Sequence, residues 1–179
     1  MVGPVITPVN HKGTHMEALE YIARILLVGI GATAVLDFWL MVIARMGVPT
    51  LNVSLVGRWV GHLCRGTFAH AAIARAEPIS GELALGWITH YAIGIAFAAV
   101  LVASQTLAWL RQPSLGPALL IGISTVLAPL FVMQPAMGAG FASSRTATPV
   151  KNVFRSITSH AVFGLGLFLF SLVAAQFLR

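Results

Sequence analysis

Charged residues and cysteine are scarce in this chain. Only 9% of its 179 residues are charged, whereas 58% are apolar, and Cys64 is the single cysteine. Soluble globular domains carry about a quarter charged residues, so this composition excludes that class and predicts an integral membrane protein. One cysteine also excludes an internal disulfide and a metal cluster held by several thiolates of one chain.

Motifs for common enzyme chemistry and for nucleic-acid binding are lacking as well. Neither Gly-x-Ser-x-Gly nor His-Glu-x-x-His occurs, so the sequence does not support a hydrolase or a zinc protease and favours a protein without enzymatic activity. The net charge of +6 comes from cations at the ends of apolar runs, not from a basic face with interleaved aromatic residues. This placement suits a lipid bilayer as partner and argues against nucleic acid.

Four apolar segments are long enough to cross a bilayer as helices. They occupy about residues 21–46, 81–110, 115–141 and 153–178. The first is too long for a removable signal peptide and lacks its small-residue cleavage pattern. Residues 1–20 precede it as a flexible tail with prolines and glycines. The sequence therefore predicts an all-α, four-span transmembrane helix bundle over residues 21–179, with both termini on one side.

A helical pattern also occupies the longest connection, between the first two spans. Over residues 51–65, apolar positions fall on one arc of a helix, and Arg58, His62 and Arg65 fall on the opposite arc. This pattern predicts an interfacial amphipathic helix whose basic face meets water and headgroups. A short soluble cap on the bundle is the alternative, because amphipathicity alone does not separate the two.

Two prolines interrupt the third apolar segment. Pro129 and Pro135 each remove a backbone donor and free the carbonyl four residues earlier, and Met133, Gln134 and Met137 lie beside them. A freed carbonyl inside a membrane needs another partner. We therefore predict a kinked or partly unwound helix here. An ordinary proline kink without functional meaning is the alternative.

Cations are more numerous in the connections after the first and third spans than at the opposite ends of the spans. The first group is Arg45, Arg58, Arg65, Arg75, Arg145, Lys151 and Arg155, and the second is Lys12, Arg24, Arg111 and Arg179. Cytoplasmic loops carry the excess of Lys and Arg. The connections are therefore predicted to be cytoplasmic and the termini external.

Each span contains one conspicuous polar residue. Asp37, His90, Gln134 and His160 all fall about 5–10 Å from the side that holds the long connection, at a rise of 1.5 Å per residue. A carboxylate in hydrocarbon costs at least a few kcal/mol, and imidazole partners offset part of that cost. We therefore expect Asp37 to face His90 or His160.

Small, hydroxyl-bearing and thioether residues accompany these four. The predicted supporting set is Thr33, Gly86, Gly94, Met133, Met137, Ser156 and Gly164. Glycines one helical turn from a histidine allow another helix, or a flat ligand, to come close.

Three functions suit such a polar layer. The leading hypothesis is a transporter-like or ligand-binding membrane protein in which Asp37 accepts a proton or pairs with a cation. The first alternative is a redox subunit in which His90 and His160 bind heme b, or bind a first-row metal together with Asp37. The second is a structural subunit whose polar layer only fixes helix packing. Because four helices enclose little room for a substrate path, we expect a homodimer or a larger membrane complex.

Five stretches of the chain carry a family resemblance. They are Gly31–Trp39, Leu51–Asn52 with Val56–His62, Gly81–Glu82 with Leu85–Trp87 and His90–Tyr91, Met133–Pro135 with Met137–Gly140, and His160–Gly164. In this order they resemble the bacterial membrane protein family known as domain of unknown function 2938, over about residues 16–178. The resemblance implies a multi-pass protein of the bacterial inner membrane and supports the helical fold. It brings no activity, ligand or catalytic residue with it.

Overall fold

The computed structural model describes residues 11–178, with side chains from residue 18 onward, and every regular element in this part is a helix. Four stretches are long and apolar enough to cross a membrane, namely Ala18–Arg45, Glu82–Ser104, Leu115–Ala136 and Pro149–Phe177. The predicted four-span helical architecture is therefore confirmed, and the chain is a membrane protein. The helices are α1 His11–Arg45, α2 Val53–Leu63, η1 Ile73–Arg75, α3 Glu82–Ser104, α4 Leu107–Arg111, α5 Leu115–Ser124, η2 Pro129–Met133, α6 Gln134–Ala136, η3 Phe141–Ser143 and α7 Pro149–Phe177.

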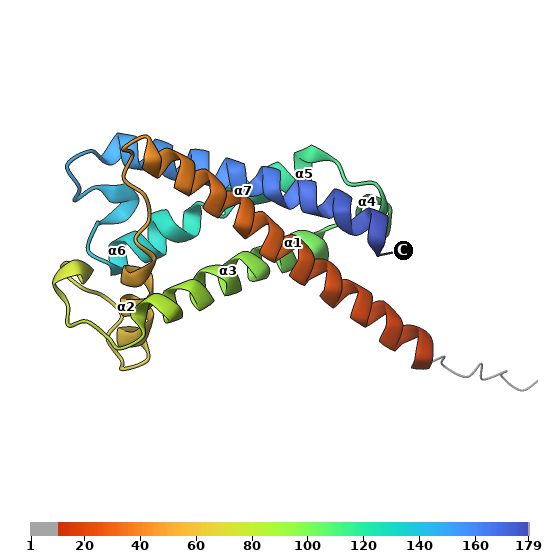
Figure 1. Ribbon diagram of the computed structural model, residues 1–179, viewed down its shortest axis with the longest axis horizontal. Helices are drawn as coiled ribbons and strands as arrows, with labels where there is room; N and C mark the ends of the chain where they lie inside the picture. Colours follow the sequence, from red (N-terminus) through yellow and green to blue (C-terminus); the bar gives the residue numbers. More distant parts are fainter. Residues whose placement is uncertain (1–10, 179) are drawn as a thin grey trace, which may run out of the picture.

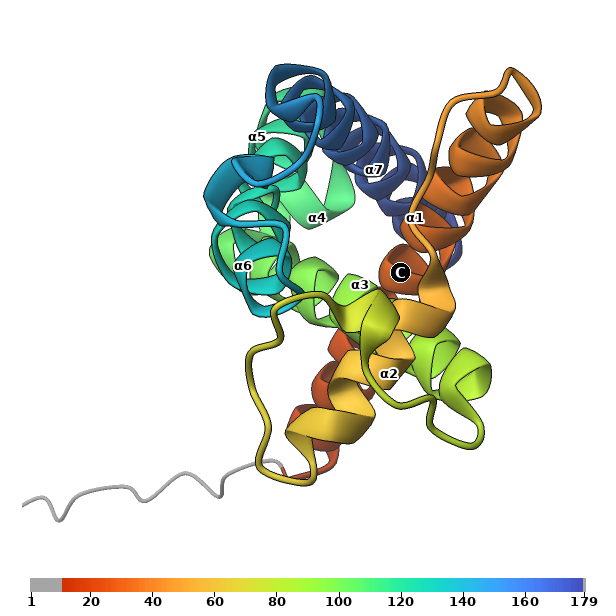
Figure 2. The ribbon, with the colours of Figure 1, turned by 90° about the vertical axis from the view of Figure 1, so that its left-hand side faces the viewer.

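The spans pack in the order α3, α1, α7, α5. Helix α1 contacts α3 on one side and α7 on the other, α7 contacts α5, and α3 and α5 contact each other little. Figure 1 shows α2, α6 and their loops gathered at one end of the bundle, with α4 and the C-terminus at the opposite end. Figure 2, viewed from the loop end, shows the four spans following one another around the bundle.

Glycines allow the spans to approach closely. A Cβ atom built on Gly122 of α5 would lie 2.3 Å from Cα of Gly164 on α7, and one built on Gly29 of α1 would lie 2.6 Å from Cα of Ile95 on α3. In a bilayer, helix association depends on such close packing, because lipid is as apolar as the helix surface. The core between the spans is made of Val28, Ala32, Ala98, Leu101, Ala118, Phe163, Leu167 and Ala174.

Two span boundaries differ from the prediction. Helix α1 is helical from His11, the first described residue, and so extends into the expected tail of residues 1–20. The rest of that tail, residues 1–10, lies outside the described residues. The second span ends at Ser104 instead of about residue 110. Gln105 has an extended backbone, and the hydroxyl of Thr106 accepts from the Trp109 amide at 3.3 Å, so a separate helix, α4, begins here.

The third span is partly unwound, as its prolines predicted. Helix α5 ends at Ser124, and a π-helix, η2, occupies residues 129–133. Past that point, the carbonyls of Ala136 and Met137 accept from the amides of His70 and Ile73 at 2.8 and 3.0 Å. The loop between the first two spans therefore supplies hydrogen-bond donors to the unwound end of the third.

Helix α2 lies across the first turn of α3. A Cβ on Gly57 would lie 1.8 Å from the carbonyl oxygen of Glu82, so the two backbones nearly touch. Trp59, on the same helix, packs with Ile73 and Ala136 in a small second core. One side of α2 therefore packs against other parts of the protein. Its placement in the headgroup plane stays a prediction.

Candidate intramembrane polar site

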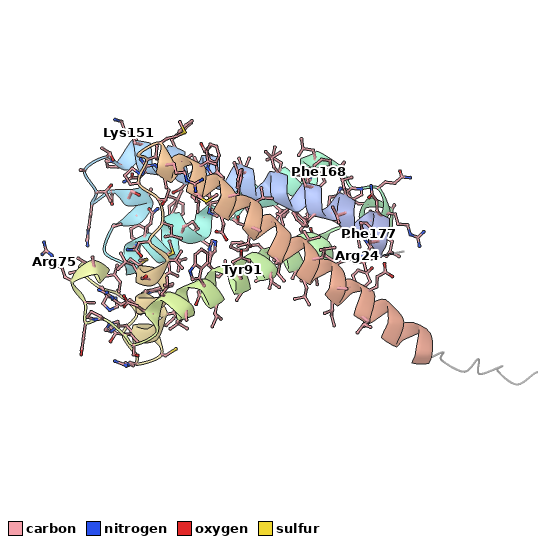
Figure 3. The ribbon with its side chains drawn as sticks, in the orientation of Figure 1. Arg24, Arg75, Tyr91, Lys151, Phe168 and Phe177 are labelled. Carbon is pink, nitrogen blue, oxygen red and sulfur yellow. The ribbon has the colours of Figure 1, made fainter. Side chains whose placement is uncertain are left out.

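Asp37 is the centre of a hydrogen-bonded cluster between α1 and α3. Nε2–H of His90 donates to Oδ1 of Asp37 at 2.9 Å, and the hydroxyl of Tyr91 donates to Oδ2 at 2.9 Å. The side chains of Asp37 and His90 retain only 22% and 14% exposure. Figure 3 shows Tyr91 projecting from α3 toward the interior of the bundle. Both carboxylate oxygens therefore have partners, which offsets part of the cost of burying the acid.

Helices α1 and α3 approach each other closely one helical turn from this cluster. Thr33 precedes Asp37 by one turn, Gly94 follows His90 by one turn, and both are buried. The Thr33 hydroxyl donates to the Gly29 carbonyl at 2.7 Å, and a Cβ on Gly94 would lie 2.0 Å from that hydroxyl. The predicted contact between Asp37 and His90 therefore follows from a close helix crossing directly beside it.

His160 lies in a second hydrogen-bonded group, between α7 and α5. The hydroxyl of Thr125 donates to the Gly122 carbonyl at 2.6 Å, which uses its only hydrogen. Nδ1–H of His160 is then the donor to the Thr125 oxygen at 2.8 Å, and Nε2 carries the lone pair of the neutral ring. Thr125 was not among the predicted site residues. The sequence feature that could have identified it is a hydroxyl four residues before Pro129, where the helix loses an amide donor.

Asp37, His90, Tyr91, His160 and Thr125 are together called the polar layer. Each candidate span contributes at least one of them, since Thr125 lies in the span Leu115–Ala136, directly after α5. Among the described residues, no hydrogen bond joins the Asp37 group to the His160 group. Of the two predicted histidines, His90 alone bonds to Asp37.

Gln134 lies outside this layer, unlike the prediction. Its side-chain oxygen accepts from the hydroxyl of Ser143 in η3 at 2.8 Å. The π-helix before Gln134 and the turn after Ala136 change the helical phase, so depth along an ideal helix no longer gives the direction of the side chain. Gln134 therefore fastens the end of the third span to the next loop.

The supporting residues serve helix packing. A Cβ on Gly86 would meet the Val53 carbonyl at 2.1 Å, and one on Gly164 would meet Cα of Leu119 at 3.0 Å, so helices occupy the space beside these glycines. Met133 and Met137 pack against the second core around Trp59 and Ile73, away from Asp37. Within the described residues, Ser156 makes no side-chain hydrogen bond to the polar layer.

A metal site made of His90, His160 and Asp37 is not assembled. Among the described residues, no group of three His, Cys, Asp or Glu side chains is arranged to hold a metal ion. Nε2 of His90 is directed at Asp37, whereas Nε2 of His160 is free of that contact. The two imidazoles also differ as candidate axial ligands for heme. Nε2 of His160 is free of a contact with Asp37, whereas His90 would have to give up its bond to Asp37 or use Nδ1.

The basic face predicted for α2 is also different in the structure. Nε and Nη2 of Arg58 donate to the two carboxylate oxygens of Glu82 at 2.8 and 2.9 Å, and Nη1 donates to the Ala76 carbonyl at 3.1 Å. The hydrogen bonds to Glu82 raise the pKa of Arg58 above its ordinary value. His62 contacts the Glu77 carbonyl at 3.0 Å, and only Arg65 is fully exposed. Arg58 therefore ties α2 to α3 and does not face solvent.

Arg24, at the end of the bundle opposite the loops, is a buried cation that the sequence analysis did not predict. Arg24 was assigned to the headgroup region, yet it is only 5% exposed. It donates to the Glu20 carboxylate at 2.8 Å, to the Leu110 carbonyl at 3.2 Å and to the Leu178 carbonyl. Figure 3 shows Arg24 beside the C-terminal end of α7, near Phe177. Arg24 thus links the ends of α1, α4 and α7 far from the polar layer.

Four apolar spans, two of which carry a hydrogen-bonded Asp, His and Tyr cluster, define the class as a polytopic α-helical membrane protein. One protein family matches residues 26–174, and the chain belongs to it: its description is Protein of unknown function (DUF2938). No match was found among curated proteins or among solved structures.

Proposed function

We propose that this protein is a transporter-like membrane protein that binds a proton at the Asp37–His90 pair. The observation that carries the proposal is the double engagement of Asp37, whose two oxygens accept from His90 and Tyr91 at 2.9 Å each. A carboxylate held by two donors inside apolar spans is an acid–base group by default, because intramembrane Asp and His mark proton and substrate routes.

The charge of the pair favours a proton as the bound ion. With Asp37 ionised and His90 neutral, the pair carries one negative charge within the membrane. A proton on Nδ1 of His90 converts the pair to a carboxylate and an imidazolium, which carry no net charge together. A metal cation would instead compete with the two donors that already occupy the carboxylate.

His160 supplies a second acceptor in the same layer. Its Nδ1–H is held by Thr125, so Nε2 is the nitrogen that is open to a proton. A proton leaving His90 toward His160 would pass from the α1–α3 side of the bundle to the α5–α7 side. We infer that these imidazoles carry the proton, with Tyr91 orienting the carboxylate.

Location and assembly belong to the same proposal. We place the protein in a bacterial inner membrane with the loop end in the cytoplasm, because Arg75 and Lys151 lie at that end (Figure 3). The groove beside Phe154 is not lined by the polar layer. One four-helix bundle leaves little room for a substrate path, and a homodimer or larger complex would provide such a path.

The test is proton flux into liposomes that contain the purified protein and a trapped pH-sensitive dye, driven by a potassium diffusion potential. Wild type should acidify the lumen faster than empty liposomes. Asp37→Asn should abolish this excess flux, and Tyr91→Phe should reduce it. Glu77→Gln changes an exposed carboxylate outside the layer and should leave the flux intact.

Two results would refute the proposal. The first is wild-type flux equal to that of empty liposomes, with and without added candidate solutes. The second is equal loss of flux in Asp37→Asn and Glu77→Gln, which would show that the flux does not depend on the Asp37 carboxylate in particular. If the layer only fixes packing, Asp37→Asn should lower stability without changing any transport or cellular phenotype. An absorption spectrum of the purified protein checks the heme alternative, since a Soret band lost in His160→Ala would replace the proton assignment.

A further inference from the structure

An open apolar groove runs along the first turns of α7. It has a volume of about 330 Å³ and is lined by Ala142, Pro149, Val150, Val153, Phe154 and Ile157. Val150 and Phe154 are 82% and 71% exposed, so the groove is open to the surroundings. From Pro149 to Ile157 the helix rises about 12 Å, close to the roughly 15 Å hydrocarbon thickness of one leaflet. The groove therefore lies at the start of the fourth candidate span, Pro149–Phe177.

Three cations are close in sequence to the residues that line this groove. Arg145 follows η3, Lys151 lies in the first turn of α7, and Arg155 lies one turn further, where it donates to the Pro49 carbonyl at 3.0 Å. No acidic residue follows Glu82 in the sequence. Within the described residues, no carboxylate forms an ion pair with any of these three cations. Figure 3 shows Lys151 at the loop end of α7, opposite Phe177.

We propose that this groove binds an anionic phospholipid of the surrounding bilayer. An acyl chain lies in the apolar groove, and the phosphate lies between Arg145 and Lys151. Basic sites at the membrane boundary attract anionic headgroups, and an adjacent apolar groove adds the burial that a soluble phosphate lacks. The proposal does not depend on the proton site, because none of the residues named here belongs to the polar layer.

The experiment measures lipid binding to delipidated protein in neutral detergent by native mass spectrometry, with phosphatidylglycerol and phosphatidylcholine of identical chains. Wild type should bind phosphatidylglycerol more tightly. Arg145→Gln with Lys151→Gln should weaken phosphatidylglycerol binding by about fivefold per charge removed, and leave phosphatidylcholine unchanged. Phe154→Ala should weaken both lipids alike, because it removes part of the groove and no charge.

Matched controls lie at the other end of the bundle. Arg111→Gln removes an exposed cation there, and Phe177→Ala removes an aromatic side chain as exposed as Phe154, so neither should change lipid binding. Circular dichroism checks that each variant keeps its helices. Equal binding of the two lipids, or equal weakening by Arg111→Gln, would overturn the proposal. So would competition by soluble glycerol phosphate as effective as that by phosphatidylglycerol, since the groove would then contribute nothing.

Discussion

Gly94→Ala should push α1 and α3 apart next to the Asp37–His90 pair. The added Cβ would lie 2.0 Å from the Thr33 hydroxyl oxygen, whereas real Cβ contacts are essentially never shorter than 3.0 Å. The helices must therefore separate by about 1 Å, and overpacking of this kind costs about 1–3 kcal/mol. Alanine regains up to about 1 kcal/mol of helix propensity. The net loss in free energy of unfolding should be about 1–2 kcal/mol.

The neighbouring residue provides a sharper test. After the Thr33 hydroxyl, the next atoms are Cβ of Thr33 at 3.3 Å and the Gly29 carbonyl oxygen at 3.5 Å, so the hydroxyl alone causes the severe overlap. Thr33→Ala removes it and should cost about 0.5–1.5 kcal/mol for the lost bond to Gly29. In that background, Gly94→Ala should become neutral or stabilising, which gives a coupling energy of about 1–3 kcal/mol in a double-mutant cycle.

The free energy of unfolding is measured for wild type, the two single variants and the double variant, by unfolding in mixed micelles followed by circular dichroism. Gly116→Ala is the control, because nothing lies within 4 Å of a Cβ built there. Strict additivity of Gly94→Ala and Thr33→Ala would show that the helices do not cross as described. The Asp37–His90 contact would then lose its structural support as well.

Three further predictions test other contacts. Gly57→Ala should lower the free energy of unfolding by about 1–3 kcal/mol, since the new Cβ would lie 1.8 Å from a backbone oxygen that cannot rotate away; chemical unfolding measures it. Glu82→Gln should lower the unfolding temperature in scanning fluorimetry more than Glu77→Gln, because only Glu82 holds the Arg58 guanidinium through two oxygens. Arg24→Gln should cost about 1.5–3 kcal/mol and speed hydrogen exchange in the last turn of α7; unchanged exchange there would contradict the link.

The direction of a side chain around the helix axis was predictable from sequence only where the helix stays regular. Asp37 and His90 lie on uninterrupted helices, and their contact agrees with the expectation drawn from spacing. Gln134 follows a π-helix and turns to Ser143 instead. Each extra residue in a wider helical turn rotates everything after it, so a prediction by ideal period fails beyond that point.

Burial of the charged groups was the least predictable feature. Arg24 was expected at a span end and Arg58 on the basic face of an interfacial helix, since sequence position gives no information about which carbonyls and carboxylates converge on each arginine. In the folded chain, Arg24 meets the Leu110 and Leu178 carbonyls, and Arg58 meets Glu82. These partners lie far along the chain from each arginine, so only the packing of helices could reveal them.

The sequence by itself determined that this chain is a membrane protein and that four of its helices are long and apolar enough to cross the bilayer. Those properties depend on apolar length and on the scarcity of charge, which are local and additive along the chain. The tertiary structure alone decided which polar groups meet. It brought Thr125 to His160 and removed Gln134 from the layer. Such pairings depend on the rotation of each helix about its own axis, and that rotation is fixed by contacts between distant segments.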